Sequence, residues 1–255
     1  MIAKEELNIL WSLEQTAKKY EDRVAVSDVN QELTWKGLVK KAQVIGAELS
    51  KKVQPGNPIP VLLEKSSETL AVMLGIVYAG CFYVPVNPMN PAERLRKIME
   101  KLEPEVIISD EKGKEQLEAV GVGLEEKVIG PETLLPTTGT DLSEEQRSKL
   151  EQIQGQWKET DALYGIFTSG STGTPKAIVV SHGAVSRFVR HFTEIFEITS
   201  EDVIGNQAPF DFDVSVKDIY SSIMTGAQLV LIPKGYFSTP PRLLDLSLIH
   251  ISEPT

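Results

Sequence analysis

The stretch Tyr164–Lys176, with the sequence YGIFTSGSTGTPK, constrains this 255-residue chain more than any other segment. It contains three glycines and five Ser or Thr hydroxyls, and it lies between the apolar runs Ala162–Phe167 and Ala177–Val180. Glycines let a backbone come close to an anion, while N–H groups, hydroxyls and a lysine can donate hydrogen bonds to it. The pattern therefore predicts a loop that holds the phosphates of a nucleotide.

Two other interpretations of this stretch fit less well. A Walker A loop requires GxxxxGK[ST], whereas here Lys176 follows Pro175 and Ala177 comes next. A flexible Ser/Gly-rich linker would not be expected between two apolar runs. The phosphate loop remains the interpretation that accounts for the glycines, the hydroxyls and the lysine together.

Composition excludes several classes of protein. A net charge of −10 argues against a nucleic-acid partner. The single cysteine, Cys81, cannot form an internal disulfide, which fits a reducing compartment. With 41% hydrophobic residues, the chain can bury a sizeable core as one large domain or two small ones. We expect a cytoplasmic protein, and no residues stand out as metal ligands.

One segment could be mistaken for a membrane span. Leu70–Val86 is nearly all apolar and is close to the length that crosses a bilayer. Glycines and a proline interrupt it, and Ser66 can cap a helix at its start. We therefore expect a helix over Ser66–Ala79 and a buried strand over Phe82–Val86, with no membrane partner.

Helical and strand patterns alternate along the chain, which favours an α/β fold with layered, largely parallel sheets flanked by helices. A helix is expected over Glu5–Tyr20, Thr34 should cap another, and Pro91 should open a third that reaches about Leu102. The polar segment Gly130–Lys158 is expected to be a surface excursion. Beyond the loop the pattern predicts strand Lys176–Val180, helix His182–Phe196, strand Asp202–Asn206, helix Ser215–Met224 and strand Gln228–Ile232.

The segment TSGSTGTPK closely resembles the signature loop of the adenylate-forming enzymes, which include acyl-CoA synthetases, luciferases and the adenylation domains of nonribosomal peptide synthetases. The family usually has Gly where Ala177 stands, a difference of one methyl group. The resemblance implies that the loop embraces the β- and γ-phosphates of ATP while a carboxylate attacks the α-phosphorus, chemistry that depends on positioning and charge neutralisation. It implies phosphate contacts from Thr168, Ser169, Gly170, Ser171, Thr172, Gly173, Thr174 and Lys176.

A second candidate site lies in PFDFDVSVKDIY, Pro209–Tyr220, where carboxylates precede an apolar helix. The structural interpretation is a capping box, because Ser215 and Asp218 have the required spacing. That interpretation leaves Asp213 unexplained.

FDVS, Phe212–Ser215, resembles the FDxS motif of family members that activate amino acids, in which the aspartate holds the substrate's α-ammonium group. A carboxylate suits this role because burying an amine without a partner is costly. By this resemblance Asp213 is the amine anchor, and Val214 and Lys217 line the pocket for the substrate side chain.

Two further segments agree with the family in order and spacing. LTWKGL, Leu33–Leu38, looks like the LTYxEL motif, and Gly75–Pro88 looks like the LKAGxAYVPLDP motif. The resemblance covers about residues 10–245. His182 occupies a position where family members often carry histidine near the substrate pocket. A structural role at the start of a helix is the alternative for this residue.

Several family features do not occur in this sequence. These are the tyrosine–glycine–proline–threonine–glutamate motif for adenine and Mg²⁺, the ribose-binding aspartate, the hinge, and the C-terminal domain with its catalytic lysine. Lys176 is not that lysine, so no catalytic residue is assigned. We expect residues 1–246 to be a truncated N-terminal (AMP-binding) domain, the N-terminal portion of the adenylate-forming fold. We also expect residues 247–255 to be a non-native tail, and the chain alone to be inactive.

The resemblance implies a protein that uses ATP and Mg²⁺ to convert an amino acid to an aminoacyl-adenylate. The acyl group would then pass to the phosphopantetheine thiol of an acyl or peptidyl carrier protein. The pattern PFxFDxSVxDxY leans toward D-alanine–carrier protein ligase over a peptide-synthetase adenylation domain. Two alternatives stay open. One is a fatty- or aryl-acyl-CoA synthetase, for which Asp213 would have no ammonium group to bind, and the other is an inert nucleotide-binding or carrier-docking fragment.

Overall fold

A computed structural model of the chain describes residues 5–121, 123–135, 141–168, 175–238 and 241. The chain forms two sheets, a six-stranded one with the order β6-β5-β3-β4-β7-β8 and a four-stranded one with the order β2-β1-β10-β9. The strands are β1 (Val24–Ser27), β2 (Glu32–Thr34), β3 (Pro58–Leu62), β4 (Phe82–Pro85), β5 (Ile107–Ser109), β6 (Val128–Ile129), β7 (Ala162–Thr168), β8 (Lys176–Ser181), β9 (Val203–Asn206) and β10 (Gln228–Leu231). The α-helices are α1 (Ile9–Lys19), α2 (Trp35–Leu49), α3 (Ser67–Tyr78), α4 (Ala92–Leu102), α5 (Glu111–Val120), α6 (Glu144–Gly155), α7 (His182–Ile195) and α8 (Val214–Thr225).

The strands pair mainly in parallel, which confirms the predicted α/β fold. Within the six-stranded sheet β6, β5, β3, β4 and β7 run in parallel, and β8 returns antiparallel to β7. In the four-stranded sheet β1, β10 and β9 are parallel and β2 is antiparallel to β1. Parallel neighbours need long crossover connections, and α3 and α4 supply them between β3, β4 and β5.

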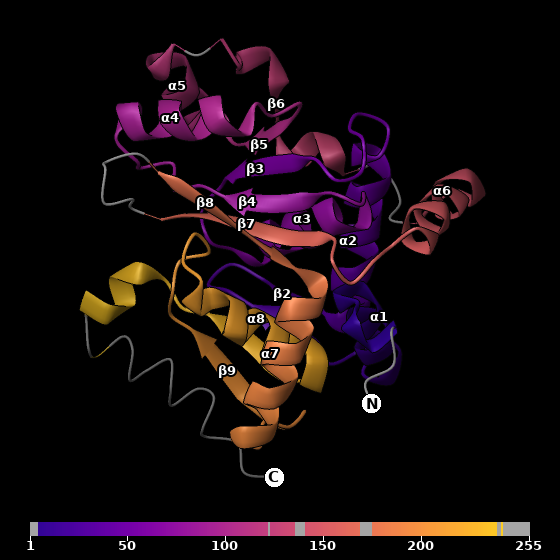
Figure 1. The fold of residues 1–255 in the computed structure, drawn as a ribbon. Helices are drawn as coiled ribbons and strands as arrows, with labels where there is room; N and C mark the ends of the chain where they lie inside the picture. The colour runs from indigo at the N-terminus through magenta and orange to yellow at the C-terminus, as the bar shows by residue number, and fades with distance from the viewer. Residues whose placement is uncertain (1–4, 122, 136–140, 169–174, 239–240, 242–255) are drawn as a thin grey trace.

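Both faces of the six-stranded sheet are covered (Figure 1). On one face Leu95 of α4 and Leu117 of α5 pack against Leu62 and Val84. On the other face the alternate residues, such as Val61, join the main core with α1, α2, α3 and α8. Because both faces are buried, these strands appear in the sequence as short continuous runs of apolar residues.

The apolar segment 70–86 forms a helix and a strand, as predicted. The Ser66 hydroxyl accepts a hydrogen bond from the Thr69 N–H at 3.1 Å, and α3 is buried on nearly every side before β4 follows. Within the described ranges, none of the helices combines the length and the apolar character that a bilayer crossing requires.

Helix starts were predicted more accurately than helix extents. The Thr34 hydroxyl accepts from the Gly37 N–H at 3.1 Å and caps α2. The helix expected over Glu5–Tyr20 is wrong at its start, because Asn8 caps α1 through the Leu10 N–H and separates it from a short 3-10 turn. The sequence patterns did not predict β2 or α5. The expected surface excursion contains α6, which extends to the right in Figure 1. The tail predicted at 247–255 lies outside the described residues.

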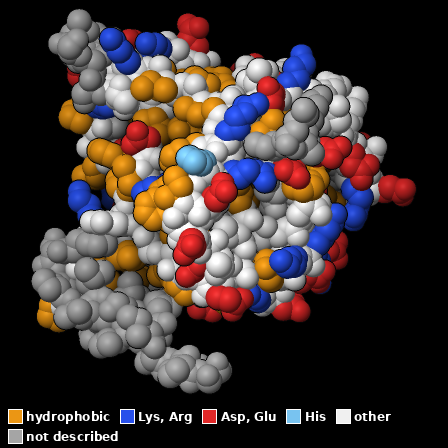
Figure 2. All heavy atoms as spheres, turned by 60° about the horizontal axis from the view of Figure 1, so that its bottom comes forward, with side chains coloured by type: hydrophobic (Ala, Val, Ile, Leu, Met, Phe, Trp, Pro, Cys, Tyr) orange, Lys and Arg blue, Asp and Glu red, His pale blue; other side chains and the backbone are white. Residues whose placement is uncertain are grey.

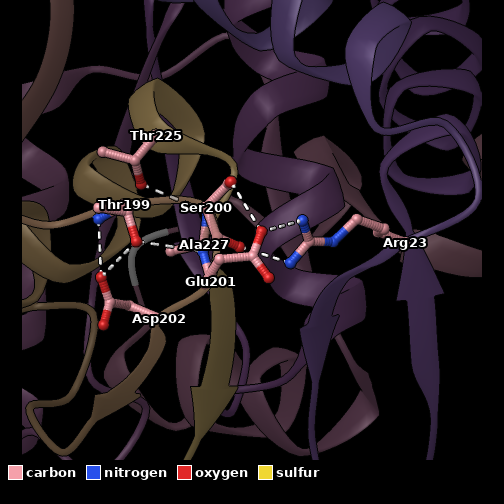
Figure 3. A network of polar contacts seen from close by, with 7 residues as sticks. All are labelled: Arg23, Thr199, Ser200, Glu201, Asp202, Thr225 and Ala227. Atoms are coloured by element: carbon pink, nitrogen blue, oxygen red, sulfur yellow. Dashed lines mark hydrogen bonds and ion pairs between the residues drawn. The ribbon is translucent and has the colours of Figure 1, made fainter. Parts of the chain in front are cut away.

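Polar contacts hold the amino ends of the four-stranded sheet together (Figure 3). Arg23, just before β1, donates to the Glu201 carboxylate at 2.9 Å and to the Ser200 carbonyl. The Asp202 carboxylate closes the turn before β9 by accepting from the Thr199 N–H and hydroxyl at 2.7 and 3.0 Å. These contacts fix the strand ends on the side opposite to the candidate site.

An apolar ridge follows the outer side of α7. The rings of Phe188, Phe192 and Phe196 contact one another in sequence, with centroid separations of 6.0 and 4.5 Å. Phe188 and Phe196 are more than half exposed. Figure 2, which turns the bottom of Figure 1 toward the viewer, shows hydrophobic side chains gathered in several groups on this side of the molecule.

Helices α2 and α3 approach one another at two glycines, Gly46 and Gly75. A Cβ on Gly75 would lie 2.7 Å from the Cβ of Ile45 and 3.0 Å from the Ala42 carbonyl oxygen, and one on Gly46 would lie 2.5 Å from the Cβ of Tyr78. These separations are shorter than van der Waals contact, so the packing of the two helices requires glycine at both positions.

We expect Gly75→Ala to lower the free energy of unfolding by about 1–3 kcal/mol, because the added methyl group overpacks the contact between α2 and α3. Urea denaturation of the 255-residue chain measures it. Gly155→Ala at the end of α6 is the matched control, since its Cβ would meet nothing within 4 Å and alanine favours the helix. Equal effects of the two substitutions would contradict the packing argument.

Candidate functional site

The stretch Tyr164–Lys176 forms an antiparallel hairpin of β7 and β8. Thr168 ends β7 and is paired with Lys176, which starts β8, and both side chains are exposed. The six predicted phosphate contacts between them, residues 169–174, lie outside the described residues. Thr168 and Lys176 thus stand side by side where the predicted phosphate loop begins and ends. A guanidinium nitrogen of Arg94 donates to the Phe167 carbonyl at 3.2 Å and links α4 to this end of β7.

A cavity of about 960 Å³ lies where the carboxyl ends of the two sheets meet. Its lining includes Lys65 after β3, Asn87 after β4, Gln207 after β9 and Lys234 after β10. Ligands of parallel α/β sheets bind at the carboxyl ends of strands. Because β7 is parallel to β4, Thr168 at the end of β7 lies at this same edge of the six-stranded sheet.

Asp213 stands at the start of α8, immediately before its first residue Val214. The Asp213 side chain is exposed, and its carboxylate makes no capping hydrogen bond to the helix. Burial, and after it the negative charge of Asp213, raises the pKa of Tyr164 on β7. Phe212 and Val214, the two neighbours of Asp213, line the cavity. Asp213 itself is not one of the residues that line the cavity, and its carboxylate is exposed between two that do.

The capping-box interpretation of Ser215 and Asp218 is wrong. Ser215 lies inside α8 and its hydroxyl donates backward to the Phe212 carbonyl at 2.7 Å. Asp218 is buried, accepts a hydrogen bond from the Asn206 side-chain amide at 3.0 Å and forms an ion pair with Lys217. Asp218 and its partner Lys217 both line the cavity, so Asp218 contributes to the cavity wall and not to the helix terminus.

The structure brings Val214 and Lys217 together on the cavity wall. Lys217 is partly exposed, pairs with Asp218, and has its ammonium nitrogen 5.9 Å from the centroid of the Phe192 ring. The apolar ridge of α7 therefore contacts the lysine that faces the cavity.

The structure does not bring His182 to the cavity. His182 is 3% exposed at the start of α7, and its Nδ1 accepts from the Ile9 N–H at 3.4 Å. Its ring contacts Trp157 edge-on at 5.7 Å. Burial lowers the pKa of His182 to about 3, so the ring is neutral at physiological pH. In this environment the ring joins α7 to the start of α1.

Sequence reasoning missed several charged residues of the cavity, among them Lys65 and Asp211. The Lys65 ammonium donates to oxygens of the loop after β9, and burial lowers its pKa to about 8 while the charge of Asp218 opposes the shift. Burial raises the pKa of Asp211, opposed by Arg94 and Lys234. The available signal was position, because Lys65 comes three residues after a strand of a parallel sheet.

The base of the hairpin offers groups that can bind an anion, the Thr168 hydroxyl and the Lys176 ammonium group. In the part of the chain that the structure describes, no group of three His, Cys, Asp or Glu side chains could hold a metal. Mg²⁺ is commonly bound through one or two carboxylates and the phosphates of a nucleotide, so it would enter with ATP.

Comparison with known proteins identifies the family. Residues 13–255 match the family described as AMP-binding enzymes. The chain belongs to this family. It is 33% identical over 233 residues to a mycosubtilin synthase protein of Bacillus subtilis, covering 91% of this chain and 8% of that protein. It is 28% identical over 242 residues to D-alanine–D-alanyl carrier protein ligase of Staphylococcus aureus (strain Newman), covering 94% of this chain and 45% of that protein.

Among solved structures, the nonribosomal peptide synthetase FmoA3 matches with a TM-score of 0.75 and 26% identity, covering 89% of this chain and 23% of that one. The resemblance to adenylate-forming enzymes, and to their amino-acid-activating members in particular, is confirmed for most of the chain. The chain spans less than half the length of each of these three proteins.

We expect His182 to make stability fall with acidity. Its folded pKa of about 3 lies below the ordinary value near 6.5, so between these values the unfolded chain binds a proton that the folded chain excludes. The free energy of unfolding should therefore drop by about 1.4 kcal/mol per pH unit as pH falls below about 6.5. His182→Gln should remove this slope.

Urea denaturation of both chains from pH 7 to pH 4 measures the difference, since all other titrating groups are shared. Parallel pH profiles for the two chains, or an imidazole of His182 that titrates above pH 5 in NMR spectra, would contradict the buried neutral ring.

Proposed function

We propose that this chain carries the ATP and amino-acid sites of an enzyme that forms an aminoacyl-adenylate and pyrophosphate. The observation that carries the proposal is the position of Asp213. An exposed carboxylate without a capping role stands between two residues that line a large cavity, and β7, which leads into the predicted phosphate loop, ends at the same edge of the sheets. An amine and a triphosphate could thus be bound within one site.

The proposed roles follow from charge. The Asp213 carboxylate binds the substrate ammonium group, and Val214 and Lys217 contact its side chain. Lys176 neutralises charge on the β- and γ-phosphates, together with Thr168 and the loop residues 169–174. The substrate carboxylate attacks the α-phosphorus, and pyrophosphate leaves. We do not include His182 in this site, since it is buried between α7 and α1.

We further propose that the acyl group passes to a carrier protein. The relatives include a D-alanine–D-alanyl carrier protein ligase and a mycosubtilin synthase. In this step a phosphopantetheine thiol attacks the acyl carbon of the adenylate, the thioester forms and AMP leaves. A free-standing ligase and a synthetase module would both carry out this step.

A second candidate is the activation of a fatty or aryl acid. Phe212 and Val214 are at least half exposed and line the cavity, which suits an apolar substrate. Asp213 argues against this candidate, since an uncharged acyl chain offers this carboxylate no cationic partner.

We expect Lys176→Ala to slow amino-acid-dependent exchange of pyrophosphate into ATP ten- to hundredfold, because a charge-assisted contact to the leaving pyrophosphate is lost. The gene product with any downstream coding sequence restored is the sample. The Michaelis constant for the amino acid should change little. Lys114→Ala on the exposed side of α5 is the matched control. An unchanged rate for Lys176→Ala would remove this lysine from the site.

We expect Asp213→Asn in the same protein to abolish exchange with amino acids, because the ammonium group loses its charged partner at the cavity. Asp141→Asn, which removes an exposed carboxylate paired with Lys40, should leave the exchange unaffected. If Asp213→Asn were saturated at the same amino-acid concentrations as the wild-type protein, another group would have to bind the amine.

A further inference from the structure

We propose that Lys65 is a positioning residue for the amino-acid site, holding the loop after β9 in the place from which Lys217 and the start of α8 reach the cavity. The inference rests on the proposed function and adds a residue to it. Lys65 itself binds protein oxygens, so its effect on the substrate acts through the elements that it holds.

The Lys65 ammonium group is surrounded by oxygens of one short segment. It lies 3.0, 3.1 and 3.3 Å from the backbone carbonyl oxygens of Asn206, Gln207 and Ala208. It also lies 3.2 Å from the side-chain oxygen of Asn206. Carbonyl groups of three successive residues that point to one cation leave the segment little freedom, and this segment leads through Pro209 into the FDVS motif.

A hydrogen-bonded chain continues from Lys65 to the substrate side. Asn206 is fully buried, and while its side-chain oxygen accepts from Lys65, its amide nitrogen donates to Asp218 at 3.0 Å. Asp218 in turn pairs with Lys217 on the cavity wall. Four side chains, Lys65, Asn206, Asp218 and Lys217, thus fix one another in order, from the end of β3 to the first turn of α8.

Lys65 also joins the two sheets at the cavity. It follows β3 of the six-stranded sheet, whereas Asn206 ends β9 of the four-stranded sheet, and the two sheets share no strand. Without the ammonium group, the carbonyls of Gln207 and Ala208 would lose this donor at a partly buried position, while that of Asn206 would keep the Ile232 N–H at 3.1 Å. Unpaired polar groups of this kind are costly, and the segment would move to find water.

The positive charge of Lys65 is required for this arrangement. Burial lowers the pKa of Lys65 to about 8, and the nearby Asp218 carboxylate keeps it from falling further. The other charged groups around this cavity are Glu64 beside Lys65, Lys217 on α8, Asp211 before α8 and Lys234 after β10. Neutral Lys65 would donate fewer hydrogen bonds, so the arrangement should weaken as pH rises through about 8.

The test compares Lys65→Met and Lys65→Arg with wild type in pyrophosphate exchange, using the gene product with any downstream coding sequence restored. Lys112→Met is the matched control, because Lys112 pairs with Glu64, the neighbour of Lys65, from an exposed position on α5. We expect Lys65→Met to raise the Michaelis constant for the amino acid roughly tenfold or more, and that for ATP less than about twofold.

Lys65→Arg should keep the Michaelis constant for the amino acid within about threefold of the wild-type value at pH 7.5, because guanidinium keeps the charge and the donors. In wild type the Michaelis constant for the amino acid should increase as the pH is raised beyond about 8. In Lys65→Arg this increase should be absent, since arginine stays protonated. Lys112→Met should follow wild type at every pH.

The role of Lys65 would be overturned if Lys65→Met kept the wild-type Michaelis constants, or if the constants for ATP and for the amino acid increased equally. Either result would leave the proposed function in place. A wild-type protein that exchanges pyrophosphate with no amino acid would overturn both. Should Lys65→Met fail to fold, the pH dependence of Lys65→Arg decides, because an alkaline rise identical to that of wild type excludes Lys65 as its origin.

Discussion

The structure depends on the burial of helix α3. All of its residues except Glu68 are buried, and it packs against α1, α2, α6 and β4 within one core. Such a helix is stable only where other elements cover it all round. Two contacts set its position, the close approach to α2 at Gly46 and Gly75 and the tether of Ser67, whose N–H and hydroxyl both donate to Asp28 at 2.7 Å.

Fixing α3 also fixes the edge of the sheets at which the site lies. The helix begins shortly after Lys65 and so fixes the carboxyl end of β3, and β4, which follows the helix, pairs with β3 in parallel. Asp28 belongs to the loop after β1 of the other sheet, and its bonds to Ser67 draw the two sheets together at this edge. The cavity forms between these ends, which explains why its charged residues are widely separated in the sequence.

Much of the fold could be predicted because local rules and tertiary structure agree. Ser66 and Thr34 cap helices where their hydroxyls and the following apolar spacing indicated. Short elements such as β2 and β6 were missed, since two or three residues carry no measurable periodicity. The parallel sheets followed from alternation, whereas the division into two sheets depends on β1 pairing with β10, about 200 residues away.

Residues of the candidate site could be predicted from the sequence only where the resemblance to a family assigned them a role. Asp213 and Lys176 follow from motifs, and the geometry places them at one edge of the sheets. Ser215 shows the limit of a local rule, because the spacing of a capping box occurs inside a helix that begins one residue earlier. For Lys65 the only signal was its position just after a strand, and no motif marks Lys65 or Asn206, since their partners are more than 140 residues and 12 residues away.

The central claim is that a carboxylate at the cavity selects an amine-bearing acid for reaction with ATP. Pyrophosphate exchange by the gene product, with any downstream coding sequence restored, tests it most directly when each amino acid is compared with its analogue lacking the amino group. The account predicts exchange with at least one amino acid and none with the corresponding des-amino acid. Faster exchange with fatty or aryl acids than with any amino acid would contradict it.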